Sequence, residues 1–281
     1  MKIGYHTRER MVMLFKTVLF LLIGFVFLLP LLWMISASLQ TPGEIFQKDF
    51  QWIPKTPLWE HYKIVWSDSD APMGRAYLNS AFVTVMSIVA SLSFASLAAY
   101  AFAKIEFKGK NFVFMMFLST MMIPTEVTLI PRFMLFNTIG LYNNHWAIIL
   151  PHWFAPSAIF LLRQFYMGLP TDLMEAAKID GAAHPRIFAQ IMLPLTKAAL
   201  VSQCVLSFVS CWNDYMSPLI FLVKRELYVV SQVIQWTILD EMARTDLTMT
   251  ASSLSIIPVV VIFMFCQRFF IEGIATSGVK G

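Results

Sequence analysis

The sequence has few charged residues for its length. Only 14% of its 281 residues are Asp, Glu, Lys or Arg, whereas 58% are apolar, and mean hydropathy is +0.66. A soluble domain could not bury so much apolar surface, because a single core stops growing at roughly 250–300 residues. The composition excludes an ordinary soluble globular protein and predicts an all-α, polytopic membrane protein. The net charge of +4 fits membrane topology rather than nucleic-acid binding.

Motifs for catalysis, metal binding and nucleotide binding are also missing. The sequence contains no Gly-x-x-x-x-Gly-Lys-Ser/Thr loop, no His-Glu-x-x-His pair and no Gly-x-Ser-x-Gly elbow. Cys204, Cys211 and Cys266 lack disulfide or metal spacing and lie in apolar runs, where they are interpreted as packing residues. We therefore expect no enzyme activity, no catalytic residue, no metal site and no cofactor bound by this chain.

Long runs without charge separate clusters of charged residues. At ~1.5 Å per helical residue, such runs are long enough to cross a ~30 Å hydrocarbon layer. They predict about six spans, at residues 17–39, 80–103, 111–125, 144–162, 197–222 and 249–268. The first run has an alternative interpretation as a cleaved signal peptide, because 36–38 resembles a cleavage site. Its apolar part is longer than the usual ~7–15 residues, which favours a span.

Lys and Arg are more frequent on the side of the membrane that carries the N-terminus, and this side is therefore predicted to be cytoplasmic. The chain then divides into a cytoplasmic N-terminus (1–16), a membrane domain (17–270) and a cytoplasmic tail (271–281). A polar interval at 171–194 lies on the cytoplasmic side, and the loop at 223–248 lies outside.

The polar interval is the most distinctive segment, and its first half predicts a short helix. Thr171 can cap a helix that begins at Asp172, whose carboxylate suits the helix N-terminus. One side of this helix is expected to be shallow and apolar, so that another protein can approach it closely; it carries Leu173, Ala176 and Ala177.

The second half of the interval predicts a turn and another helix. Gly181 permits a chain reversal that a side chain would hinder. A helix is then expected to start at His184-Pro185 and to carry apolar residues back toward the membrane, namely Ile187, Ile191 and Met192. The interval is interpreted as a docking element for a soluble partner, with an ordinary cytoplasmic hairpin as the alternative.

The order of these residues resembles a known family. EAAKIDGAAHPRIFAQIMLP (175–194) resembles the EAA loop of ABC importer permeases, which has an EAA opening, a glycine and an I-x-LP close. Three further strings resemble the carbohydrate-uptake class, in particular the second permease of the maltose-transporter type. They are MIPTEVTLIP (122–131), WNDYMSPLIF (212–221) and QRFFIEGIATSGVKG (267–281). The resemblance covers most of the chain after Asn79.

The resemblance implies the transmembrane domain of a type I ABC importer in a bacterial cytoplasmic membrane. Its expected partners are a second, homologous permease subunit in a heterodimer, a dimer of ATPase subunits that bind ATP and Mg, and an extracytoplasmic solute-binding protein. The implied solute is a mono- or oligosaccharide. Glycerol 3-phosphate or another small polar solute is the alternative, and a secondary transporter is a further one, although broken midplane helices and inverted repeats are not evident.

Residue roles are also carried over from the family. Residues implied to couple to the ATPase are Glu175, Ala176, Ala177, Asp180, Gly181, Ile191, Leu193 and Pro194. The tail residues implied to contact it are Gly278, Val279, Lys280 and Gly281. The residues just before that tail are usually neutral or basic in the family, whereas this chain has the acidic Glu272 there. The charged groups that would pair with the tail are therefore not assigned.

Two polar positions within predicted spans complete the list of candidates. Asn213 and Asp214 are candidates for lining the solute path, because an acid within a span is costly and usually faces protein or water. Asp214 lies late in its span, and the alternative is an interfacial bond to a neighbouring helix. A small-residue stripe at Ser87, Ser91, Ala95, Ala99 and Ala103 predicts close helix packing, either within the chain or against a second subunit.

Overall fold

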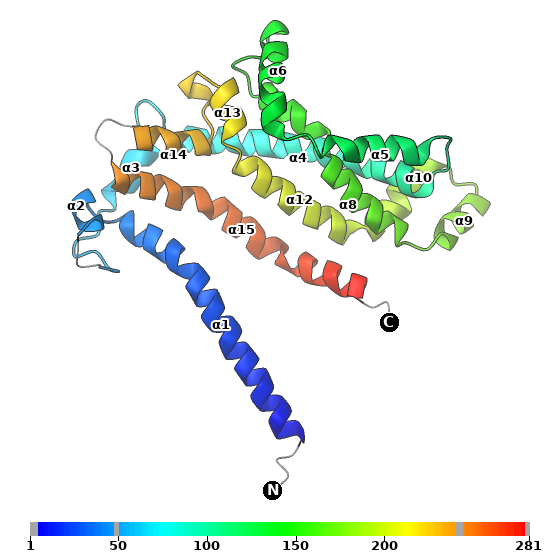
Figure 1. Ribbon diagram of the computed structural model, residues 1–281, viewed down its shortest axis with the longest axis horizontal. Helices are drawn as coiled ribbons and strands as arrows, with labels where there is room; N and C mark the ends of the chain where they lie inside the picture. The colour runs from blue at the N-terminus through cyan, green and yellow to red at the C-terminus, as the bar shows by residue number, and fades with distance from the viewer. Residues whose placement is uncertain (1–4, 48–50, 240–243, 279–281) are drawn as a thin grey trace. The chain divides into compact units, whose positions relative to one another are not determined.

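This computed structural model describes residues 5–47, 51–239 and 244–278, without the side chains of 5–7, 239 and 269–278. Every regular element in those ranges is a helix (Figure 1). The predicted all-α class is therefore confirmed. Contacts divide the chain into two units, Met1–Asp68 with Ile234–Ile256, and Ser69–Val233 with Ile257–Gly281.

The first unit contains the long helix α1 (Tyr5–Ala37) and the short helices α2 (Pro42–Ile45) and α3 (Glu60–Trp66). It also includes parts of α14 (Val230–Leu239) and α15 (Thr245–Gly278). The most apolar stretch of α1 has no residue buried inside the chain. A helix that is apolar on all sides and uncovered by its own chain is suited to a lipid environment.

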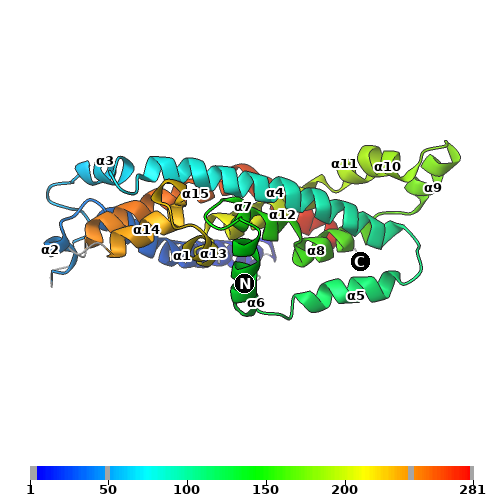
Figure 2. The same cartoon turned by 90° about the horizontal axis from the view of Figure 1, so that it is seen from above.

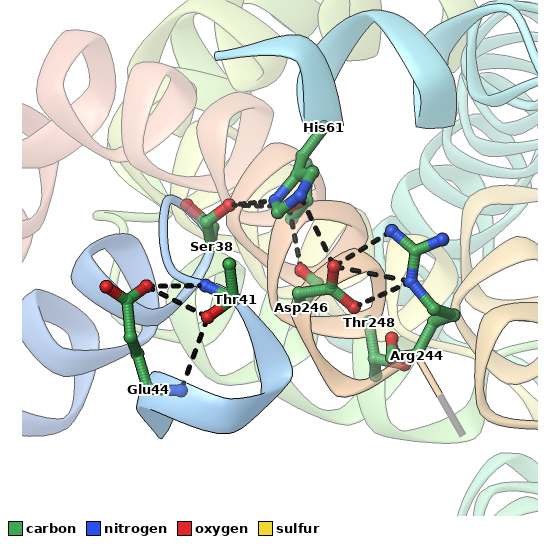
Figure 3. Close-up of polar contacts among 8 residues, drawn as sticks. Ser38, Thr41, Glu44, His61, Arg244, Asp246 and Thr248 are labelled. Atoms are coloured by element: carbon green, nitrogen blue, oxygen red, sulfur yellow. Dashed lines mark hydrogen bonds and ion pairs between the residues drawn. The ribbon is translucent and has the colours of Figure 1, made fainter. Parts of the chain in front are cut away.

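Buried polar side chains join the end of α1 to α3 and α15 (Figure 3). Asp246 is only 1% exposed, and its Oδ2 lies 2.9 Å from Arg244 Nη2 and 3.3 Å from His61 Nε2. His61 Nδ1 lies 3.0 Å from the Ser38 carbonyl oxygen. His61 therefore faces an acceptor oxygen at each ring nitrogen. The cluster thus places a guanidinium and an imidazole against one buried carboxylate.

A capping box forms the start of α2. The Thr41 N–H donates to Glu44 Oε2 at 2.9 Å, and the Glu44 N–H donates to the Thr41 hydroxyl at 3.3 Å. The hydrogen bonds from the Thr41 backbone and hydroxyl lower the pKa of the Glu44 carboxyl below its ordinary value. This carboxyl belongs to the short helix α2, and its hydrogen bonds are exposed to solvent.

The second unit is built around α4 (Met73–Lys104), which packs against α8 (Pro156–Met167) and α12 (Lys197–Trp212) (Figures 1 and 2). The small-residue stripe lies on the packed face of α4: Ser87, Ser91, Ala95 and Ala99 are buried, and Ala103 is half-buried. The stripe was predicted to pack either within the chain or against a second subunit, and in the structure it packs within the chain. Small side chains let the neighbouring backbones approach closely.

The remaining elements of this unit surround that packed centre. In chain order they are α5 (Lys110–Thr120), α6 (Thr125–Thr138), α7 (Trp146–Ile149), η1 (Leu150–Trp153), α9 (Asp172–Ile179), α10 (His184–Ile187), η2 (Phe188–Met192), α11 (Leu193–Leu195), α13 (Met216–Phe221) and η3 (Arg225–Leu227). The three cysteines are free thiols, with Cys211 buried and the other two half-buried.

The helices overlap the predicted spans and depart from them most clearly at 111–125 and 197–222. Among the described residues, four helical segments are long and apolar enough to cross a membrane, and up to six spans result if two bent helix pairs each count as one. The run at 111–125 ends its helix at Thr120, and α6 follows at 92° after Pro124. The run at 197–222 is helical only to Trp212. Asp214 Oδ1 accepts a hydrogen bond from the Ser217 N–H at 3.2 Å, which starts a separate helix, α13.

Candidate functional site

Helix α9 has the bounds that the sequence predicts, Asp172–Ile179. The Thr171 carbonyl accepts the first helical hydrogen bonds, from the N–H groups of Met174 at 2.8 Å and Glu175 at 3.1 Å. The expected side-chain cap is wrong, because the Thr171 hydroxyl makes no capping bond and the residue already has helical dihedral angles. Asp172 and Glu175 in the first turn are stabilised by the helix dipole instead.

The two alanines of the EAA sequence face different directions. Met174 is 4% and Ala177 is 8% exposed, and both pack into the core of the second unit. Leu173 and Ala176 are exposed, and Ile179 is 87% exposed. The expected apolar face that groups Ala177 with Leu173 and Ala176 is therefore wrong. The three-residue spacing from Met174 to Ala177 puts that pair on the side that α9 turns toward its own chain.

Gly181 ends α9 as predicted, with a left-handed φ of +78°. The Gly181 N–H donates to the Lys178 carbonyl at 3.0 Å, and the Ala182 N–H donates to the Ala177 carbonyl at 2.9 Å. These two bonds form a Schellman motif, in which two otherwise unpaired carbonyls at the end of a helix are satisfied. Ala182 and Ala177 also belong to one apolar cluster, which accompanies this type of cap.

The chain then returns through α10, η2 and α11. Pro185 lies in the first turn of α10, where its missing N–H costs nothing. Pro194 lies in α11 and has no N–H to donate to Gln190. The π-helical turn η2 directly precedes α11. At Thr196 the axis turns by 77° into α12, and the Thr196 hydroxyl donates to the Met192 carbonyl at 2.9 Å.

An apolar cluster and a side-chain contact hold this hairpin, residues 171–196, against α4 and α8. Ile187 and Met192 are fully buried in the cluster together with side chains of α4 and α8. The side-chain contact is Tyr100 Oη to His184 Nδ1 at 2.9 Å. Just before the hairpin, Lys104 Nζ donates to the Leu169 carbonyl at 2.7 Å. The hairpin is thus anchored firmly at its base.

The exposed face of the hairpin is acidic and apolar. Residues 172–180 carry three carboxylates, Asp172, Glu175 and Asp180, and one cation, Lys178, which gives this segment a net charge of −2; the exposed Arg186 on α10 brings the whole hairpin to −1. No ion pair involves these residues in the part of the chain that the structure describes. Between them lie the exposed apolar side chains of Leu173, Ala176 and Ile179. Such a face can bind a cleft that is basic and partly apolar.

The structure separates the predicted coupling residues into three groups. Glu175, Ala176 and Asp180 lie on the exposed face. Ala177 and Ile191 pack into the core, while Leu193 and Pro194 lie at the bend before α12. Gly278 is the last residue of α15, and Val279, Lys280 and Gly281 lie outside the described residues.

Asn213 and Asp214 lie at the break between α12 and α13. Asn213 is exposed, whereas Asp214 is half-buried and lines a hollow of about 410 Å³, the Asp214 hollow. Residues that also line it are Glu126, Arg132, His152, Phe154 and Ser210. None of these five residues was expected from the sequence to line a solute path. The spacing of Gln203, Ser207 and Ser210, all polar on one face of α12, is a signal that could have indicated a polar hollow.

Comparison with known proteins decides the family. Residues 91–275 match the family described as the inner membrane component of binding-protein-dependent transport systems. The match contains the hairpin, α12 and the break at Asp214. The chain belongs to this family. The resemblance inferred from the EAA sequence is confirmed, and family membership argues against a secondary transporter.

Relatives and a solved structure extend the match over nearly the whole chain. The arabinooligosaccharides transport system permease protein AraQ of Halalkalibacterium halodurans is 34% identical over 267 residues, which cover 94% of this chain and 95% of that protein. The sn-glycerol-3-phosphate transport system permease protein UgpE of Yersinia pestis is 32% identical, with 86% and 88% covered. A chain of a bacterial ABC transporter involved in the import of the acidic polysaccharide alginate superposes with a TM-score of 0.79 at 25% identity, covering 95% and 99%.

The family sets the general role of the chain. It is an inner membrane component of a binding-protein-dependent transport system. The fold is that of an ABC importer transmembrane domain.

Proposed function

We propose that this chain is the permease subunit of an ATP-dependent importer for a mono- or oligosaccharide, and that it forms half of the translocation path. The observation that carries the proposal is the exposed acidic and apolar face of α9, on a hairpin anchored to α4 and α8. The chain has no nucleotide-binding motif, so a separate ATPase must supply the energy.

In this function α9 seats in a cleft of the ATPase subunit, and Glu175 makes a polar contact there. The net charge of −2 on residues 172–180 complements a basic cleft. Met174 and Ala177 hold α9 to the core, so a displacement of the exposed face is transmitted to α4 and α8. ATP shifts the equilibrium between inward- and outward-facing states only through its different affinity for the two states.

The proposed assembly places two cytoplasmic termini and the hairpin on the same side of a bacterial cytoplasmic membrane. Partners are a second homologous permease in a heterodimer, a dimer of ATPase subunits with ATP and Mg, and an extracytoplasmic solute-binding protein. The tail 278–281 contacts the ATPase, and the loop 223–248 faces the binding protein. The excess of Lys and Arg on the N-terminal side supports this orientation.

Two observations support a sugar as the solute. The relative AraQ is named for arabinooligosaccharides, and the motifs resemble the carbohydrate-uptake class. The relative UgpE, named for sn-glycerol 3-phosphate, supports the second candidate, a small polyol phosphate.

Cysteine cross-linking tests the docking role. In a variant without the three native cysteines, Ile179→Cys places a thiol on the exposed face of α9, and Ile53→Cys places one on an equally exposed outer loop. We expect Ile179→Cys to cross-link to a co-purified ATPase subunit and Ile53→Cys to give no such product. Labelling of Ile179→Cys from outside intact cells, or absence of an ATPase from the purified complex, would contradict the proposal.

A further inference from the structure

Three hollows in the second unit meet at His152. The first is the Asp214 hollow, and the second, of about 240 Å³, lies between α4, α8 and α12. Polar residues that line the second are Ser87, Ser91, His152, Ser157, Gln203 and Ser210. The third measures about 10 Å³, roughly the room for one water molecule, and is bordered by Thr84, His152 and Asp214. The three hollows therefore adjoin one another around His152 and form a series within the second unit.

The polar lining is unusual for a membrane-spanning segment. Serine and glutamine side chains are costly in a lipid-facing position and are accepted where they meet water, solute or each other. Gln203 Nε2 donates to Ser207 Oγ at 3.1 Å, which leaves its carbonyl oxygen available on the same face of α12. The series is therefore interpreted as a hydrated path rather than as a packing defect.

Some buried polar atoms in the lining have no hydrogen-bond partner in the part of the chain that the structure describes. Thr84 is 1% exposed, and its hydroxyl has no hydrogen-bond partner among the described residues; the same holds for Arg132 Nε. His152 Nδ1 lies 2.8 Å from the Ile148 carbonyl, so this nitrogen carries the hydrogen and Nε2 of the neutral ring is an acceptor. Buried polar groups that the chain leaves unpaired indicate a missing water or ligand.

The charges of the Asp214 hollow discriminate between solutes. Arg132 is its one cation, and its Nη2 donates to Ser217 Oγ at 3.3 Å. Glu126 and Asp214 contribute two negative charges, so the lining carries a net charge of −1 when His152 is neutral. No other charged residue lines the three hollows in the part of the chain that the structure describes. An anionic solute meets repulsion here, whereas hydroxyl groups find carboxylate, imidazole and amide acceptors.

The same hollow offers an aromatic surface. Phe154 is exposed on its wall, beside the polar groups of Asp214 and Arg132. A sugar ring has an apolar face of C–H groups and a rim of hydroxyls, and such a wall matches both. The volume lies within the range of ~300–1,000 Å³ that small-molecule pockets occupy.

We infer that this subunit contacts the solute directly in the Asp214 hollow, and that the solute is an uncharged, hydroxyl-rich sugar rather than a polyol phosphate or another anion. This inference rests on the proposed function, since it names the solute class of the same transport path.

The reaction rates of charged thiol reagents test whether the Asp214 hollow carries a net negative charge. In the assembled transporter without native cysteines, Ser210→Cys places a thiol on the wall of the Asp214 hollow, and Ser202→Cys on the same helix is the control outside it. The rate of thiol modification is measured with a cationic and with an anionic methanethiosulfonate. The ratio of the cationic to the anionic rate is then divided by the same ratio for a free thiol in solution. We expect a several-fold preference for the cation at Ser210→Cys, which falls toward one when Asp214→Asn is added, and no such preference at Ser202→Cys. Absence of labelling, or an anion preference, overturns the inference.

Protection by solute tests the contact itself. Neutral pentose and hexose oligosaccharides and sn-glycerol 3-phosphate are compared as protectants of Ser210→Cys, and uptake of each is measured in the same proteoliposomes. Protection by a transported neutral sugar supports the inference. Uptake of a sugar without protection overturns the direct contact and leaves the proposed function standing. Protection by the phosphate overturns the solute class, and uptake of none of these solutes refutes both.

Discussion

Asp246 and Glu175 are both carboxylates in the first turn of a helix, yet the chain surrounds them differently. Asp246 is buried and is held between Arg244 and His61. Glu175 is exposed, and it forms no ion pair among the residues that the structure describes. Removing one member of a buried ion pair typically costs ~3–5 kcal/mol, whereas an exposed carboxylate contributes ~0–1 kcal/mol. The first carboxylate therefore stabilises the fold, and the second is available to a partner.

The largest effect on folding is expected at the buried carboxylate. Asp246→Asn leaves the buried end of the Arg244 side chain and the His61 imidazole without their shared carboxylate, and we expect it to lower the free energy of unfolding of the first unit by about 3 kcal/mol. Thermal unfolding of the purified chain measures this loss. Glu175→Gln is the matched control and should change stability by less than ~0.5 kcal/mol. Equal losses of stability in the two variants would contradict the different roles assigned to Asp246 and Glu175.

Two neighbouring positions in α9 separate anchoring from docking. Met174→Ala removes a buried side chain from the core that holds the hairpin and should cost about 2–3 kcal/mol. Leu173→Ala on the exposed face should leave stability nearly unchanged and weaken co-purification of the ATPase. Protease accessibility of the hairpin and the yield of the complex measure the two effects. A stable Met174→Ala hairpin would show that its anchoring lies elsewhere.

Substitution of Gly181, in the turn after α9, is expected to have a smaller effect on stability. Among the described residues no atom lies within 4 Å of a Cβ placed at Gly181, so the cost of Gly181→Ala comes from its left-handed φ and is about 1–2 kcal/mol. Gly181→Asn tolerates this conformation better and should lose less. Uptake by the complex should follow the same order. Equal behaviour of the alanine and asparagine variants would show that the dihedral angle is not the reason for glycine.

The smallest effect is expected at Glu44, a carboxylate that is hydrogen-bonded and also exposed. Its pKa is lowered in the folded chain by the Thr41 hydrogen bonds, so its stabilising contribution is present above the unfolded pKa and is lost as pH falls through the folded pKa. Glu44→Gln should therefore reduce stability slightly at neutral pH, by less than ~0.5 kcal/mol, and the difference should disappear in acid. A difference that grows on acidification would reverse the assigned sign.

The sequence predicted those parts of the site that depend on local order. The bounds of α9, the turn at Gly181 and the return helix all follow from residues within one short interval. Which alanine faces the core was predicted wrongly, because the answer depends on the surfaces of α4 and α8 that α9 meets. The same reason explains why the sequence did not reveal the pairing of Asp246 with His61 or the hollow beside Asp214, since their members come from distant segments.

The most direct test of the account is the amount of sugar taken up for each ATP hydrolysed by the complete transporter carrying Glu175→Lys. The substitution reverses one charge on the exposed face of α9 and leaves the anchoring residues Met174 and Ala177 untouched. We expect an inserted, folded chain whose uptake is lost while ATP hydrolysis no longer responds to the solute-binding protein. Normal uptake per ATP by this variant would contradict the docking role of the hairpin.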